Sequence, residues 1–455
     1  MKSYTINMTE GPIWGPLSRY LWPLLAMMVL NLAYQYADSI ILSLYGGDFA
    51  FGSVDAVGNI LYIFMGALMG LGSGGAILAG RAFGAGEHRR VGRFAEGLLF
   101  LGCAYGLLLA LVGLALALPL MRFLNVPPEM MGHSRNYLTI IFLGQLVQGP
   151  MMMSGLMMNS VGNSRSPFYI MLTSNIINVF LTLFFVAHKG WGAGGAALGT
   201  VCSQVVGLCL SLRVLHRLPQ GMAPQLKGIR PNSELVEGLK LGLPLCFQRM
   251  IYPLANILVR RQINSLGALT VSGFALNNLL VTVLWGLDGS FSTAMDTFMS
   301  QNYGKGSSER LERGLRAGLG LWAAMMVPLS LLLFVLVPFF GGFIMPDPQV
   351  VDVATHLART WFIPFYTLAA AATACRSWVV ATGHSKIAAG ITLCFDALFK
   401  SVWATFVFPL IGTGWSLFMA YPLGWISASL VFVIVYFCLK NKVYAQLTLR
   451  REEGV

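Results

Sequence analysis

The first long apolar stretch of the chain contains an aspartate, Asp38. With Asn31, Tyr34 and Gln35 it has the spacing i, i+3, i+4 and i+7, so on a helix the four side chains share one face. A charged side chain at the centre of a membrane costs about 3 kcal/mol on insertion scales and usually serves a function. We therefore expect Asp38 to point into the protein as an ion-binding group. Pro23, earlier in the same stretch, predicts a kink.

Two further polar groups could surround Asp38. They are Asn175, Asn178 and Thr182, spaced i, i+3 and i+7 in the fifth apolar segment, and Thr200, Ser203 and Gln204 in the sixth. Burial disfavours the charged form of a carboxyl group, so Asp38 among these side chains could bind and release a proton. One carboxylate together with neutral oxygens also suits Na⁺, so Na⁺ could bind at Asp38. We expect no other metal site. Alternatively, Asn and Thr simply join neighbouring helices by hydrogen bonds.

The second half of the chain has several charged residues within its apolar segments. They are Arg249 beside Gln248 and Asn256, then Asp288 and Asp296, then Arg376, and finally Asp396 and Lys400. Opposite charges could neutralise one another. Asp396 and Lys400 are spaced i, i+4 as a favourable helical pair, and Arg249 or Arg376 could pair with Asp288 or Asp296. A cavity with both signs would equally suit a zwitterionic or anionic cargo. The polar residues that we expect around a substrate cavity are Asn31, Gln35, Gln204, Gln248, Arg249, Asn256, Asp288 and Asp296.

The composition predicts a membrane protein. Of 455 residues, 56% are hydrophobic and 11% are charged, whereas soluble domains have about 25% charged residues. A membrane-spanning helix needs about 20 apolar residues. Twelve such segments can be marked, at 17–43, 54–79, 95–119, 136–160, 167–187, 193–212, 238–260, 271–299, 317–340, 355–380, 387–408 and 414–438. We expect an all-α polytopic membrane protein with twelve transmembrane helices.

The formal net charge of +12 is unevenly distributed along the chain. Lys and Arg cluster in every second connection, after the second, sixth, eighth and twelfth apolar segments; Arg260 and Arg261 are the exception. This bias marks cytoplasmic loops, so both termini are expected in the cytoplasm. The charge therefore favours contact with anionic membrane lipid and argues against nucleic acid as a partner.

The two halves of the chain repeat each other. GRAFGAG at 80–86 corresponds to SQNYGKG at 300–306, an offset of 220, and SVGNSR at 160–165 corresponds to ATGHSK at 381–386, an offset of 221. Six spans return each half to the same side of the membrane, which predicts two pseudo-symmetric six-helix lobes related by an axis along the membrane normal. The expected domains are an N-lobe at 1–215, a cytoplasmic linker at 216–233 rich in Pro and Gly, and a C-lobe at 234–455.

Several motifs together resemble the multidrug and toxic compound extrusion (MATE) transporter family of Gram-positive type. They are INMTEGP at 6–12, YADSI at 36–40, GRAFGAG at 80–86, GGAALGTVCSQ at 194–204, INSLG at 263–267 and SQNYG at 300–304. The resemblance implies two six-helix lobes and export of drug-like compounds driven by H⁺ or Na⁺.

The resemblance also assigns roles to particular residues. It implies that Asp38 is the coupling residue, with Pro23 as the kinking proline. Tyr34, Asn178 and Thr200 match its polar companions. An acid that some members carry in the fifth span is Thr182 here. The acids that another branch carries in spans seven and ten correspond to Tyr252 and the region of Ala370, which argues against coupling through the second lobe by that route.

The expected function is cation-coupled antiport of small organic compounds by a monomer in a bacterial cell membrane. A lipid-linked oligosaccharide flippase is an alternative, because Arg249, Arg376 and Lys400 could form a basic cavity. A membrane-embedded enzyme is not favoured, since the six histidines lie at or near loops without metal-ligand spacing, and no nucleophile or phosphate-binding motif occurs. No cofactor is expected other than the coupling ion.

Overall fold

The computed structural model describes residues 5–47, 50–123, 126–219, 221–225, 227, 229–412 and 414–452. The secondary-structure elements of these residues are all helices, which confirms the all-α class. Contacts divide the chain into two compact units. Unit 1 is Met1–Asn7 with Arg19–Cys246, and unit 2 is Met8–Ser18 with Phe247–Val455.

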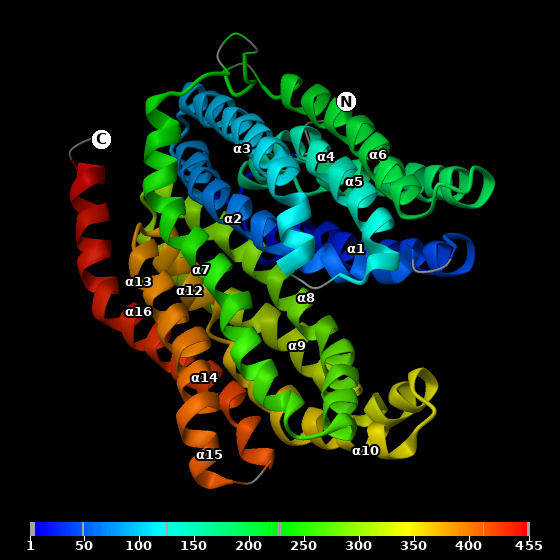
Figure 1. Ribbon diagram of the computed structural model, residues 1–455. Coiled ribbons are helices and arrows are strands. Elements are labelled where there is room, and N and C mark those ends of the chain that lie inside the picture. Colours follow the sequence, from blue (N-terminus) through cyan, green and yellow to red (C-terminus); the bar gives the residue numbers. More distant parts are fainter. Residues whose placement is uncertain are drawn as a thin grey trace. The chain divides into compact units, whose positions relative to one another are not determined.

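Unit 1 contains most of α1 and the five long helices that follow it (Figure 1). Helix α4 packs against α2, α3 and α6, and α5 packs against α6, so α4 is the central helix of this group. The elements are α1 (Trp14–Tyr45), α2 (Ala50–Gly84), α3 (His88–Phe123), α4 (Pro128–Ser160), α5 (Arg165–Thr182), the π-helical η1 (Leu183–His188) and α6 (Gly192–His216).

Unit 2 is built around α8, which packs against α9, α10 and α12 (Figure 1). Helix α16 packs against α11 and α12. Three π-helical segments, η3, η4 and η5, interrupt its later helices. The elements are α7 (Ser233–Asn264), α8 (Ala268–Gly304), α9 (Ser308–Ile344), α10 (Pro348–Leu357), η3 (Ala358–Phe362), α11 (Ile363–Ala370), α12 (Thr373–Ala381), α13 (Ser385–Thr392), η4 (Leu393–Leu398), α14 (Phe399–Val402), η5 (Trp403–Val407), α15 (Phe408–Ile411), η6 (Gly414–Leu417) and α16 (Ala420–Glu452).

Ten helices of the described residues are long and apolar enough to cross a membrane. The two remaining predicted spans are also helical, but one contains several charged residues and the other is interrupted. Residues 238–260 lie in α7, which contains Lys240, Arg249 and Arg260, and residues 355–380 lie in the interrupted run from α10 to α12. The polytopic class is thus confirmed, and the number of twelve spans stays a prediction.

The start of α7 packs within unit 1. A Cβ atom added to Gly74 of α2 would lie 2.2 Å from the backbone oxygen of Gly238, so the two helix backbones are in direct contact. Small residues permit such close approach between membrane helices. The first part of α7 therefore belongs with unit 1, although the repeat in the sequence places it in the C-lobe.

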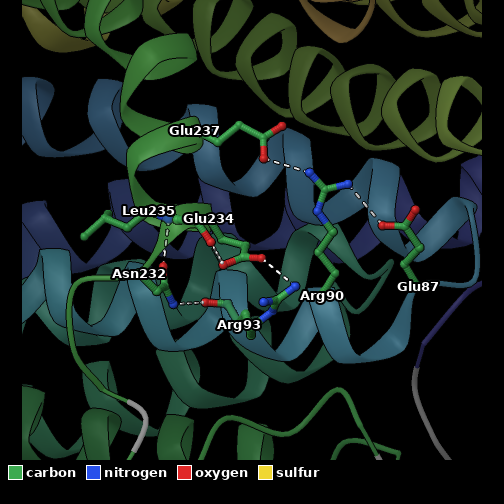
Figure 2. Close-up of polar contacts among 8 residues, drawn as sticks. Glu87, Arg90, Arg93, Asn232, Glu234, Leu235 and Glu237 are labelled. Carbon is green, nitrogen blue, oxygen red and sulfur yellow. Dashed lines mark hydrogen bonds and ion pairs between the residues drawn. The ribbon is translucent and has the colours of Figure 1, made fainter.

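Residues 232–237, which we call the linker strap, are fastened to α3 by ion pairs (Figure 2). Arg90 Nη2 lies 2.7 Å from Glu237 Oε2, and Arg93 Nη2 lies 2.8 Å from Glu234 Oε1. Glu234 is buried, whereas the other three side chains are at least one-third exposed. The strap is held mainly by side chains at the surface of unit 1.

Residues 8–11, which we call the N-terminal strap, are fastened to unit 2 through their backbone. The Met8 N–H donates to Gln301 Oε1 at 3.1 Å, and Arg310 donates to the backbone oxygens of Met8 at 2.8 Å and Gly11 at 2.9 Å. The Met8 side chain is fully buried. Helix α1 thus begins in unit 2 and continues into unit 1 after Ser18.

An exposed ion pair accompanies the N-terminal strap. Lys305 Nζ lies 2.6 Å from Glu10 Oε1. The hydrogen bond and the charge of Lys305 hold the pKa of the Glu10 carboxyl below its usual value. The contribution of this pair is therefore present at neutral pH and is lost as the pH falls through the lowered pKa. Salt screens such an exposed pair, so its contribution is small.

The limits of the compact units differ from the predicted domain limits at the two places where the chain passes from one unit to the other. Residues 234–246 lie with unit 1 and residues 8–18 with unit 2, because the contacts just described hold them there. The repeat locates duplicated sequence, whereas the units follow side-chain and backbone contacts. That the lobes at 1–215 and 234–455 move as units during transport stays a prediction.

Glycines set the distance between α3 and α4, and one of them offers a test. A Cβ at Gly149 would lie 2.2 Å from the backbone oxygen of Gly102, while a Cβ at Gly155, also in α4, has nothing within 4 Å. We expect Gly149→Ala to destabilise the protein by roughly 1–3 kcal/mol, the cost of overpacking. The matched Gly155→Ala is expected to be neutral or slightly stabilising, since Ala is the better helix former. Thermal unfolding in detergent measures both, and equal stabilities would contradict the prediction.

Candidate functional site

Asp38 lies on α1 with its carboxyl group directed at α5. The side chain is half-buried, and the hydroxyl of Thr182 is the neighbouring group that interacts with it. Its Oδ1 atom is buried without a hydrogen-bond partner among the described residues. A buried acceptor of this kind can bind a proton or a cation, because an unsatisfied polar atom in the protein interior is costly.

A chain of hydrogen bonds continues from Thr182 through α5 and α6 to α1. Thr182 Oγ1 donates to Asn178 Oδ1 at 3.4 Å, and Asn178 Nδ2 donates to Thr200 Oγ1 at 3.2 Å. Thr200 Oγ1 lies 3.4 Å from the Tyr34 hydroxyl, and it also donates to the backbone oxygen of Ala196 at 3.0 Å. Because Thr200 has only one hydroxyl hydrogen, Tyr34 is the donor in their contact.

A glycine brings α5 and α6 together at this position. A Cβ added to Gly199 would lie 2.9 Å from Thr182 Oγ1. Asn178 and Thr182 are both buried, with 1% and 0% of their surface exposed, so the amide and hydroxyl are held away from solvent. The structure thus joins five residues of the predicted coupling group, which are Tyr34, Asp38, Asn178, Thr182 and Thr200.

The other predicted residues of unit 1 are less closely associated. Asn175 is one turn from Asn178, and its Nδ2 is buried without a partner in the described part of the chain. Asn31 and Gln35 are exposed on α1, and Gln204 is half-buried on α6. Pro23 lies within α1, whose helical assignment continues across it.

Removing the hydroxyl of Thr200 tests this network. We expect Thr200→Val to weaken the apparent affinity for the coupling ion by roughly tenfold, because Asn178 and Tyr34 lose a buried partner worth about 1–3 kcal/mol. The control is Thr173→Val on α5, whose exposed hydroxyl donates only to the backbone oxygen of Tyr169. The ion dependence of transport in proteoliposomes measures both variants. Equal affinities would show that the network is structural.

Unit 2 surrounds the carboxylate of Asp288 with hydroxyl groups. Tyr366 Oη donates to Asp288 Oδ2 at 3.1 Å, and Thr373 Oγ1 donates to Asp288 Oδ1 at 2.8 Å. Asp296, two turns further along α8, lies 3.6 Å from Arg376 Nη2, which also donates to Ser292. Of the two acids on α8, therefore, one is held by hydroxyls and the other by an arginine.

Two further charges occupy the later helices of unit 2. Lys400 is fully buried, with Nζ 5.1 Å from the centre of the Tyr421 ring. Asp396 interacts electrostatically with Lys400 and Arg376. The i, i+4 spacing of Asp396 and Lys400 is crossed by the π-helical η4, so their alignment differs from that of an ideal α-helix.

Arg249 has a different environment. Its side chain is exposed, and its guanidinium interacts electrostatically with Arg376 and Asp296. Within the described residues it has no hydrogen bond or ion pair. Gln248 and Asn256 lie on the same helix and are half-buried, and Asn256 Oδ1 has no partner in the part of the chain described.

Four partners of the charged groups were not predicted from the sequence, namely Ser292, Tyr366, Thr373 and Tyr421. These side chains are neutral, and each is distant along the chain from the charged group that it contacts, so no local pattern connects the two. The spacing of Tyr366 and Thr373, i and i+7, was the available signal, since it places two hydroxyls on one helical face.

The MatE family model matches the chain twice, at residues 23–184 and 244–404. The chain belongs to the MATE family. The two matches begin 244 − 23 = 221 residues apart, which agrees with the offset of the internal repeat. MATE proteins are transporters, so the chain is a membrane transporter of small organic compounds and not an enzyme.

Known relatives and structures agree with this MATE assignment. The "Probable multidrug resistance protein YoeA" of Bacillus subtilis is 24% identical over 325 residues, 70% of each chain, which fits the expected Gram-positive type. The "FAD transporter" of Shewanella oneidensis is 24% identical over 358 residues, covering 76% of this chain and 77% of that protein. An outward-facing multidrug resistance MATE family transporter of the MOP superfamily has the same fold, with TM-score 0.84, 17% identity and coverage of 98% and 99%.

Proposed function

We propose that this MATE protein is a cation-coupled antiporter that exports drug-like organic compounds by alternating access of two lobes. The lobes are the N-lobe (1–215) and the C-lobe (234–455), joined by a cytoplasmic linker, with both termini in the cytoplasm. The buried and unpaired Oδ1 of Asp38 is the observation that supports coupling in the N-lobe. The name of the relative YoeA supports multidrug export.

The hydrogen bonds around Asp38 depend on whether its carboxyl group is ionised or neutralised. Thr182 has one hydroxyl hydrogen, so it donates either to Asp38 or to Asn178, and not to both. When Asp38 is ionised, donation to its carboxylate is favoured, because hydrogen bonds to charged groups are the stronger ones. When a proton or Na⁺ neutralises Asp38, the hydroxyl turns away from α1 and donates to Asn178 of its own helix, α5. Ion binding thereby changes the packing around α1.

The arrangement of charges favours this function over a flippase with a basic cavity. Lys400 is buried, Arg376 is paired with Asp296, and three acids accompany the three bases, namely Asp288, Asp296 and Asp396 with Arg249, Arg376 and Lys400. The sum of their formal charges is zero, so these six groups supply no net positive charge to offset the several negative charges of a lipid-linked diphosphate.

Proteoliposomes that contain the full chain and ethidium test the proposal. We expect an imposed pH gradient or an imposed Na⁺ gradient to drive ethidium against its own concentration gradient, and an ionophore for the effective ion to stop it. The gradient that works identifies the coupling ion. Ethidium movement under neither gradient would overturn the proposal.

A further inference from the structure

The charged groups of unit 2 are satisfied unequally. Asp288 is held by the hydroxyls of Tyr366 and Thr373, and Arg376 is held by Asp296 and Ser292. These contacts use the acids of α8 and leave Arg249, as described above, without an ion pair among the residues of the described ranges.

An unpaired guanidinium in a membrane-spanning protein needs an explanation. Its presence at membrane depth costs about 3 kcal/mol or more unless it pairs with an anion or with water. A structural role would bury Arg249 against a carboxylate, as Arg376 is placed against Asp296. In the described residues no carboxylate lies within ion-pair distance of Arg249, and the nearby positive charge of Arg376 adds repulsion. A second guanidinium of this kind is favourable when an anion binds between or beside the two.

One residue on the helix of Arg249, and one that interacts with it electrostatically, add a second requirement. Asp296 Oδ1 and Asn256 Oδ1 are buried without partners in the described residues. Asn256 follows Arg249 by seven residues on α7, so both lie on one helical face. A ligand that fits this surface has an anionic group for the guanidinium and hydrogen-bond donors for the two oxygens.

We propose that Arg249, assisted by Arg376, forms an anion-binding subsite that takes the carboxylate or phosphate group of an organic anion. The planar guanidinium would bind two oxygens of such a group at once, with geometry that an ammonium does not reproduce. This subsite rests on the proposed transport function and defines a substrate class for it. It makes organic anions, in addition to cations, substrates of the protein.

The test compares binding and transport of two planar aromatic dyes of opposite charge, carboxyfluorescein and ethidium. We expect the purified full chain to bind carboxyfluorescein, and Arg249→Ala to weaken that binding by roughly tenfold to 100-fold, as for the loss of a charge-assisted hydrogen bond. Arg249→Lys should retain part of the affinity. In Arg249→Ala the loss of carboxyfluorescein binding should exceed any change in ethidium transport by at least tenfold.

Arg260→Ala is the matched control, because Arg260 is also an exposed arginine of α7. It should bind both dyes as the unaltered protein does. Size-exclusion profiles establish that each variant is folded, and the partial recovery in Arg249→Lys separates loss of charge from loss of structure.

The outcomes distinguish the subsite from the proposed function. If ethidium is transported but carboxyfluorescein neither binds nor moves, the subsite is wrong and the antiporter stands. Equal loss of both dyes in Arg249→Ala would also overturn it, since the residue would then be structural. If carboxyfluorescein binds through Arg249 but no gradient moves either dye, the subsite stands and the antiporter is wrong.

Discussion

Asp38→Asn should enter the membrane at the level of the unaltered protein and lose gradient-driven ethidium transport by roughly 100-fold, the scale of a coupling free energy of about 3 kcal/mol. The amide has nearly the shape of the carboxyl group and can still accept a hydrogen bond from Thr182. The amide carries no charge, however, so at neutral pH it can neither bind and release a proton nor attract Na⁺ as a carboxylate does. Uptake into proteoliposomes under a pH gradient and then under a Na⁺ gradient measures the loss.

The control for this variant is Asp352→Asn, which removes the carboxylate of an exposed residue of α10. It should transport ethidium normally. Asp38→Glu should recover part of the activity, because it restores an ionisable group at a shifted position. Transport by Asp38→Asn within twofold of the unaltered protein, under either gradient, would rule out Asp38 as the coupling residue.

Periodicity allowed the first-unit site to be predicted in some detail. The spacing i, i+3 and i+7 placed Asn178 and Thr182 on one face of α5, and the structure joins them to Thr200 and Tyr34 by hydrogen bonds. Side chains on one face of a helix need only a neighbouring helix to meet, and membrane helices of this length have few possible neighbours. Helical pattern and polarity together were therefore enough.

The environment of Asp288 could not be predicted in the same way. The sequence left open which arginine would pair with Asp288 and which with Asp296. Arg376 lies against Asp296, whereas the carboxylate of Asp288 accepts hydrogen bonds from Tyr366 and Thr373. These residues lie 78 and 85 positions away in the chain. Such pairing depends on how α8 packs against α11 and α12, which local pattern does not determine.

The straps were also beyond prediction, for a related reason. The N-terminal strap is held through backbone oxygens, and every residue has one. The motif at 6–12 identified the segment as unusual without indicating its partner. The glycine contact between α2 and α7 likewise shows only in three dimensions, because a glycine in an apolar helix can serve packing, bending or neither.

The two straps lead to a prediction in which equivalent residues of the repeat behave differently. Arg90 and Arg310 are separated by 310 − 90 = 220 residues, the offset of the repeat. Arg90 contacts carboxylates of Glu87 and Glu237 that are nearly half exposed. Exposed ion pairs contribute about 0–1 kcal/mol, so Arg90→Ala should raise the equilibrium constant for opening of the linker strap by only a few-fold.

Arg310→Ala should have a much larger effect on the N-terminal strap. Arg310 donates to the backbone oxygens of Met8 and Gly11 and to Asn302 Oδ1 at 2.9 Å, and hydrogen bonds to charged groups contribute about 1.5–3 kcal/mol each. Loss of the two bonds to the strap, at the lower end of this range because the site is partly exposed, should open the strap roughly 100-fold more often, since each 1.4 kcal/mol is tenfold in an equilibrium. Hydrogen exchange of the Met8 amide, which is bonded to Gln301, measures the opening directly.

Arg313→Ala is the matched control for the strap, because Arg313 pairs with Glu309 of its own helix at the surface. Exchange at Met8 should be unchanged in this variant, and Arg310→Lys should fall between the two, since a single ammonium cannot bond both backbone oxygens with the geometry of the guanidinium. If Arg310→Ala and Arg313→Ala exchange at the same rate, burial of Met8 holds the strap and the arginine does not. If the exchange rates follow the expected order, Arg310 differs from Arg90 because it contacts the backbone. The position of the two arginines in the repeat is equivalent and does not explain the difference.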